Sequence, residues 1–142
     1  MKLLKVVLDT NVLVAAICSR EGASFALLSR LAEKELPFQP VLSVPLALEY
    51  EDAMHRSLQA SPLTEQDVGD FLDFLWSVSW HQEIYYLWRP LLKDPGDDLI
   101  LEVAVAAGVD YLLTFNTNDF AGAEFVGVKL ITPQALLHEL EK

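Results

Sequence analysis

Four acidic side chains occupy positions in this sequence from which they could reach one point. Asp9 directly follows an apolar segment, and Asp119 lies in the polar turn after another apolar segment. Glu49 and Asp98 lie on predicted helices. Open α/β folds bind ligands beside the carboxyl ends of their parallel strands. The sequence therefore predicts that these four carboxylates face the same edge of one sheet.

Several carboxylates at one point imply a particular chemistry. They repel one another strongly at low effective dielectric unless a cation neutralises them. Hard divalent cations such as Mg²⁺ and Mn²⁺ prefer carboxylate and water oxygens as ligands. We therefore expect a metal site. Glu102, one helical turn after Asp98, either extends this acidic group or pairs with a lysine or arginine.

Each of the four positions also has a plain structural alternative. Asp9 could serve only as the N-cap of the helix that follows it. Glu49 lies on an apolar stripe, where a carboxylate needs a partner because buried charges are rarely left unpaired. Its alternative is a partly exposed residue of a good helix former. Asp98 could complement a helix dipole, and Asp119 could form an Asx-type turn.

The elements that must position these residues follow from the apolar pattern. Strands are expected at residues 4–8, 38–43, 81–86, 110–115 and 129–132. Helices are expected at residues 11–18, 24–35, 45–58, 64–78, 98–107 and 133–140, with a loop at 95–97. Strands that alternate with helices imply a mostly parallel sheet covered by helices on both faces. The whole chain, 1–142, is predicted to form a single domain of α/β class.

Composition narrows the class of protein further. The chain has 142 residues, of which 52% are hydrophobic, and a formal net charge of −11. Such a negative charge argues against non-specific nucleic-acid binding by a long-range field, although a bound divalent ion would invert the local sign. No apolar run approaches the roughly 18–20 residues of a membrane span, and no signal-peptide pattern is present. A cytoplasmic protein is expected, with Cys18 as a small buried apolar residue.

Four segments in register resemble the PIN-domain family of metal-dependent ribonucleases, and in particular the VapC-like toxins of toxin–antitoxin systems. These segments are residues 8–13, 43–50, 94–104 and 110–120. The resemblance implies a parallel sheet of strand order 3-2-1-4-5. It also implies an acidic pocket with one or two Mg²⁺ or Mn²⁺ ions. The residues lining that pocket would be Asp9, Glu49, Asp98 and Asp119.

The resemblance also implies supporting roles for four polar residues. Thr10 and Asn11 would assist the pocket, with Asn11 orienting Asp9 or the loop. Thr114 would lie at the strand edge. Asn116 stands where many family members carry an aspartate, although the asparagine form also occurs in the VapC-like group. This difference favours one tightly held ion over two.

The chemistry implied is hydrolysis of an RNA phosphodiester by water activated at a metal ion. Asp98 or Asp119 would accept the proton. A phosphatase with Asp9 as nucleophile is an alternative, but it would need a second aspartate where this chain has Asn11. A second alternative is a partner-binding module whose acidic pocket receives an arginine, for example from an antitoxin.

The residues that would bind RNA are less well defined. Candidate phosphate contacts are Arg20, Arg56, Arg89 and Lys93. An aromatic cluster could stack bases, at roughly 1–3 kcal/mol each, or form a core or dimer contact. Its members are Trp80, Tyr85, Tyr86 and Trp88. The histidines His55, His81 and His138 are expected at the surface or in an interface. The resemblance also implies a homodimer, for which the helical hairpin 45–78 is a candidate surface.

Overall fold

The computed structural model describes residues 3–33, 35–84, 95–116, 120 and 127–141, with the backbone alone at 95–98. Within these ranges five strands form one all-parallel sheet in the order β3-β2-β1-β4-β5. The strands are β1 (Lys5–Leu8), β2 (Gln39–Leu42), β3 (Trp80–His81), β4 (Tyr111–Leu113) and β5 (Leu130–Ile131). The strand order and the α/β class are as predicted.

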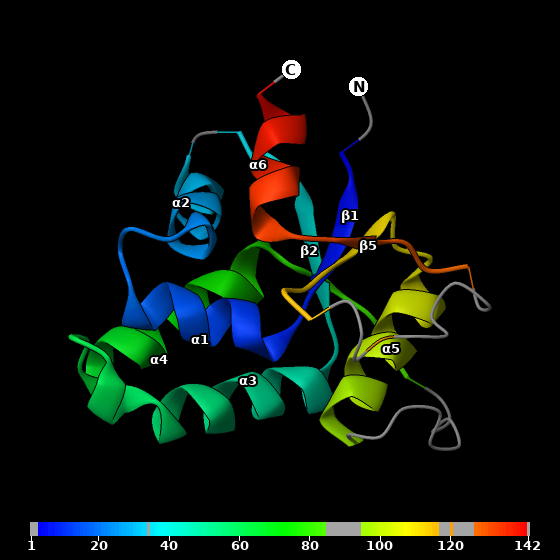
Figure 1. The fold of residues 1–142 in the computed structure, drawn as a ribbon. Helices are drawn as coiled ribbons and strands as arrows, with labels where there is room; N and C mark the ends of the chain where they lie inside the picture. Colours follow the sequence, from blue (N-terminus) through cyan, green and yellow to red (C-terminus); the bar gives the residue numbers. More distant parts are fainter. Residues whose placement is uncertain (1–2, 34, 85–94, 117–119, 121–126, 142) are drawn as a thin grey trace.

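Helices lie on both sides of this sheet, with α1 and α2 to the left of the strands in Figure 1, α5 to the right and α3 below. The helices are α1 (Thr10–Cys18), α2 (Ala23–Ser29), α3 (Val44–Arg56), α4 (Glu65–Val78), α5 (Pro95–Ala107) and α6 (Pro133–Leu140), with short 3₁₀ turns at Arg30–Ala32 and Leu58–Ala60. The predicted helix 24–35 is thus divided into α2 and a 3₁₀ turn. The predicted loop 95–97 is wrong, because α5 already begins at Pro95. Proline is well tolerated in a first helical turn, where its missing N–H has no intrahelical partner.

The central strands are buried on both faces, as a parallel sheet requires. Val6, Val7 and Leu8 of β1 are all buried in the main core. Side-chain caps then set where helices begin. The Ser43 hydroxyl accepts a hydrogen bond from the N–H of Leu46 at 3.2 Å at the start of α3, which satisfies one of the unpaired donors of a helix N-terminus.

No single helix in the described ranges is long and apolar enough to cross a membrane. Thr10–Cys18 and Ala23–Ala32 would meet that test as a pair, but a 96° bend separates them. Cys18 is partly exposed and not buried as predicted, because it is the last residue of α1, where the chain turns toward the surface.

Candidate functional site

Asp9 lies at the carboxyl end of β1, where the strand passes into α1. Its backbone N–H donates to the carbonyl of Leu113 in β4 at 2.8 Å, which ties it to the neighbouring strand. Only 2% of the residue is exposed. One carboxylate oxygen, Oδ1, accepts from the N–H of Asn11 at 3.4 Å, so Asp9 is also the N-cap of α1.

Thr114 fixes the other carboxylate oxygen of Asp9. The Thr114 hydroxyl donates to Oδ2 at 2.6 Å and accepts from the N–H of Asn116 at 3.0 Å. Its backbone N–H donates to the carbonyl of Ile131 in β5 at 2.9 Å. Thr114 is fully buried. Three adjacent strands therefore orient one buried carboxylate, and helix capping accounts for only one of its two oxygens.

A buried tyrosine on α3 forms a hydrogen bond with the carboxyl end of β1. The Tyr50 hydroxyl in α3 donates to the carbonyl of Leu8 at 2.5 Å. Burial raises the pKa of Tyr50 strongly, the negative charge of Asp9 raises it further, and the hydrogen bond to Leu8 lowers it. The phenol therefore stays protonated and remains a donor. This role of Tyr50 was not predicted from the sequence, although Leu46 and Tyr50 lie four residues apart on the buried face of the helix.

Glu49 precedes Tyr50 but has a different environment. Its side chain is 29% exposed, and its Oε1 lies 3.7 Å from Nη2 of Arg56. Arg56 also pairs with Asp52. The partner expected for Glu49 is thus an arginine that two carboxylates share, which weakens the case for Arg56 as a phosphate contact.

The remaining site predictions have mixed outcomes. The side chain of Asp98, on α5, and all of Asp119 lie outside the described residues. Glu102, one turn after Asp98, is 5% exposed. The side chain of Thr10 is half-buried, and that of Asn11 is exposed.

The outer candidates lie mostly at the surface or beyond the described ranges. Trp80 is 53% exposed and so is not a core residue, and the Lys5 ammonium lies 5.5 Å from the centre of its ring. Arg20 and Asn116 are exposed. The three histidines are also exposed, as predicted: His55, His81 and His138. Five of these candidates fall outside the described residues: Tyr85, Tyr86, Trp88, Arg89 and Lys93.

Comparison with models of known protein families identifies the family of this chain. A family model described as PIN domain matches residues 5–118, which is most of the chain. The chain belongs to the PIN-domain family. PIN domains are generally nucleases and typically use Mg²⁺ or Mn²⁺. The matched range includes Asp9, Glu49 and Asp98 and ends one residue before Asp119. No curated protein matches the chain.

The donor chemistry of this PIN domain fits such an ion. Asp9 presents a buried carboxylate, which hydrogen bonds from Thr114 and Asn11 orient. Carboxylate oxygen is the ligand that Mg²⁺ and Mn²⁺ prefer. Within the described side chains, no three acidic, histidine or cysteine groups come together as a complete metal site. Further ligands would have to come from residues such as Asp98 and Asp119.

Proposed function

We propose that this PIN domain is a Mg²⁺- or Mn²⁺-dependent endoribonuclease and the toxin of a toxin–antitoxin pair. The observation that carries the nuclease assignment is the buried Asp9 carboxylate, held by Thr114 at the carboxyl edge of a sheet with the order 3-2-1-4-5. That edge is where ligands bind in open α/β folds. The toxin role rests on the resemblance of four sequence segments to VapC-like proteins.

In this proposal Asp9, Asp98 and Asp119 hold the ion, with Glu49 at the rim of the site. The divalent ion, when bound, supplies charge stabilisation to the phosphoryl group and makes water acidic enough to lose a proton near neutral pH. Asp98 or Asp119 would accept that proton. The Thr114 hydroxyl keeps Asp9 in one rotamer, so the carboxylate does not have to reorient when substrate arrives.

Asn116 bears on the number of ions. Its backbone N–H donates to the Thr114 hydroxyl, and its side chain is an uncharged amide where many relatives carry a carboxylate. A site with one carboxylate fewer neutralises less positive charge. We therefore expect a single tightly held ion.

A phosphatase mechanism fits less well. It would need a carboxylic acid two residues after Asp9, and Asn11 occupies that position with an exposed side chain. The backbone N–H of Asn11 instead donates to the Asp9 carboxylate, which caps α1. These features favour the nuclease.

A partner-binding role is compatible with the nuclease as its inhibited state. An arginine from an antitoxin would pair bidentately with carboxylates of the pocket.

The proposed homodimer surface is the α3–α4 hairpin, where Leu48 is a large exposed apolar side chain.

The test is cleavage of single-stranded and structured RNA with Mn²⁺ or Mg²⁺. The wild type is compared with Asp98→Asn, with Asp97→Asn as a control of equal charge change one residue away, and with an EDTA sample. We expect cutting by the wild type and Asp97→Asn only. Cutting that persists in EDTA, or in Asp98→Asn at the wild-type rate, would contradict the proposal. A folded wild type that cuts no RNA would favour the partner-binding role.

A further inference from the structure

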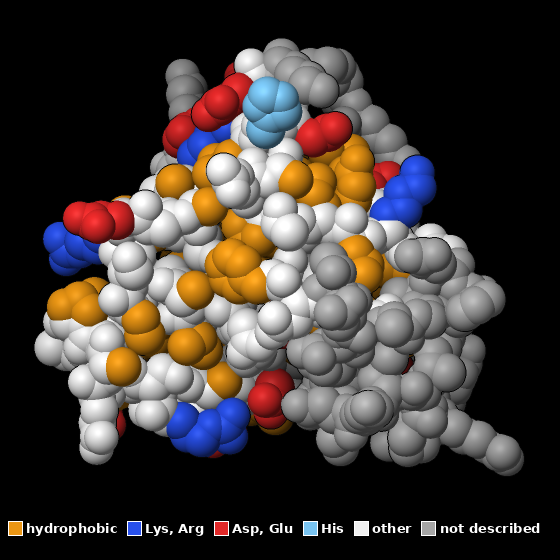
Figure 2. Space-filling view, viewed as in Figure 1, with side chains coloured by type: hydrophobic (Ala, Val, Ile, Leu, Met, Phe, Trp, Pro, Cys, Tyr) orange, Lys and Arg blue, Asp and Glu red, His pale blue; other side chains and the backbone are white. Residues whose placement is uncertain are grey.

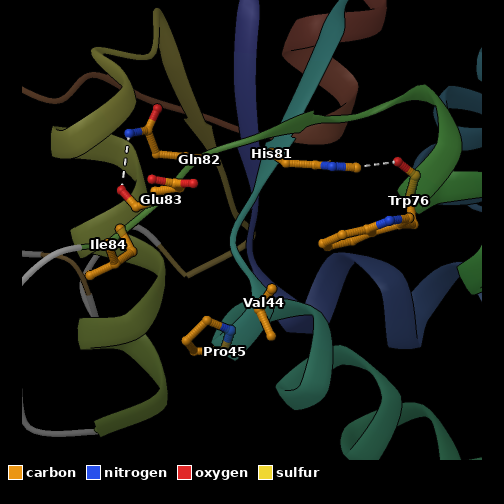
Figure 3. A pocket seen from close by; sticks show the side chains of 7 residues that line it. All are labelled: Val44, Pro45, Trp76, His81, Gln82, Glu83 and Ile84. Carbon is orange, nitrogen blue, oxygen red and sulfur yellow. Dashed lines mark hydrogen bonds between the residues drawn. The ribbon is translucent and has the colours of Figure 1, made fainter.

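A pocket opens at the same edge of the sheet, at the carboxyl ends of β2 and β3. Its volume is about 430 Å³, within the usual range for small-molecule sites. It is lined by Val44 and Pro45 at the start of α3, by Trp76 of α4 and by residues 81–84 (Figure 3). We refer to this set of residues as the β3 pocket.

Two stacked rings form one wall of the β3 pocket. The centroids of the Trp76 and His81 rings lie 3.7 Å apart, with 23° between the ring planes. Nε2 of His81 lies 2.7 Å from the carbonyl oxygen of Trp76 (Figure 3). A carbonyl can only accept, so Nε2 is the donor in this contact. The ring pair is held in place before any ligand arrives, which lowers the entropy cost of binding.

The β3 pocket lies near Asp9 in the sheet. β2 pairs with β1, whose carboxyl end carries Asp9, and β3 pairs with β2 on the other side. Neighbouring strands are about 4.8 Å apart, so the ends of β1 and β3 are separated by roughly 10 Å. Neighbouring nucleotides of one strand can span that separation.

Charge determines which part of a nucleotide suits this pocket. The chain has 21 acidic and 10 basic residues, and in the coloured part of the face in Figure 2 the lysines and arginines are scattered and form no basic patch. In this part of the surface, the release of counterions from RNA phosphates by lysine and arginine contacts therefore provides little affinity. The described lining of the β3 pocket contains no lysine or arginine and one carboxylate, Glu83. Such a lining disfavours a phosphate and accepts an uncharged base.

We propose that the β3 pocket binds an unpaired base of the RNA, next to the phosphodiester that is cut, through contact with the Trp76–His81 ring pair. Val44 and Pro45 supply apolar contact on the opposite side, and base–aromatic stacking is how proteins hold single strands without relying on charge. This inference rests on the proposed ribonuclease function. It assigns the affinity for substrate to base contacts, since the net charge of the chain opposes phosphate binding.

The first test is binding of short, fluorescently labelled single-stranded RNA to the full chain in EDTA, where no metal-dependent cleavage occurs. The wild type is compared with His81→Ala, with His81→Phe, which keeps an aromatic ring, and with His138→Ala, an exposed histidine on α6. We expect His81→Ala to raise the Kd about tenfold. His81→Phe should stay within about threefold of the wild type, and His138→Ala should match it. A Kd for His81→Ala equal to that of the wild type would overturn the proposal.

The second test removes single bases from the RNA. A series of oligonucleotides, each with a single abasic site at a different position, is compared with the intact RNA. The wild type should lose about tenfold in affinity at one position, and His81→Ala should lose nothing further there, because the two changes remove the same contact. Equal losses in both proteins would overturn the proposal. Because binding is measured without metal, a failure of this inference is distinct from an absence of cleavage in Mn²⁺.

Discussion

Asp9 and Glu49 have the same predicted role in very different surroundings. Asp9 is 2% exposed, and the Thr114 hydroxyl holds its carboxylate at 2.6 Å. The Glu49 side chain is 29% exposed and lies 3.7 Å from an exposed arginine, Arg56. The position of a residue at a strand end is set by hydrogen bonds to neighbouring strands. The position of a side chain on an exposed helix face is set by contacts with other side chains. Asp9 is therefore the fixed group, and Glu49 the adjustable one.

Substitution of the two carboxylates should separate these roles most strongly. We expect Asp9→Asn to reduce RNA cleavage more than about a hundredfold and Glu49→Gln about tenfold, measured as kcat/KM in Mn²⁺. Asparagine is also a good N-cap, so thermal unfolding of Asp9→Asn should stay cooperative. Equal losses in the two variants would remove the distinction between a fixed and an adjustable ligand.

Removal of the Thr114 hydroxyl should affect both activity and stability. Thr114→Val keeps the shape but leaves the N–H of Asn116 and the Asp9 carboxylate each without this partner. We expect about 1–3 kcal/mol less stability in urea unfolding and a roughly tenfold loss of cleavage. Thr114→Ser should restore most of both. A valine variant with unchanged activity would show that Asp9 does not depend on this contact.

Tyr50→Phe should affect stability more than activity. It removes the donor to the Leu8 carbonyl, for an expected loss of about 1–2 kcal/mol at neutral pH. The folded protein keeps the Tyr50 proton because its pKa is raised, whereas an unfolded tyrosine loses its proton above about pH 10. The stability due to Tyr50 is thus present below that pH and is lost above it. Unfolding measured from pH 7 to 11 should show the variant and wild type converging, and a constant difference would contradict this reasoning.

The smallest effect is expected at Arg56. Exposed ion pairs contribute little, so Arg56→Gln should change stability by less than about 0.5 kcal/mol, and cleavage by less than about threefold. Salt titration of the wild type should likewise show little change in stability from this pair. A large loss of RNA affinity in Arg56→Gln would restore this residue as a phosphate contact.

The sequence was sufficient to predict the order of elements, because β-branched runs, helical spacing and caps such as Thr64 are local signals. Thr64 caps α4, and the Asp67 side chain accepts from the backbone N–H of Thr64 in return. The resemblance to the PIN family supplied the strand order. The contacts of Tyr50 with Leu8 and of Trp76 with His81 were not predicted. They depend on how helices pack against strand ends, and neither residue spacing nor composition encodes that geometry.

The most direct test of the proposed metal centre is titration with Mn²⁺, followed by calorimetry, of the wild type, Asp9→Asn and Asp52→Asn. Asp52 is an exposed acidic residue on α3, so its variant controls for the loss of one negative charge. We predict one ion bound by the wild type and by Asp52→Asn, and affinity at least about tenfold weaker in Asp9→Asn. Binding by Asp9→Asn as tight as that of the wild type would contradict the assignment of the strand-end carboxylate as a metal ligand.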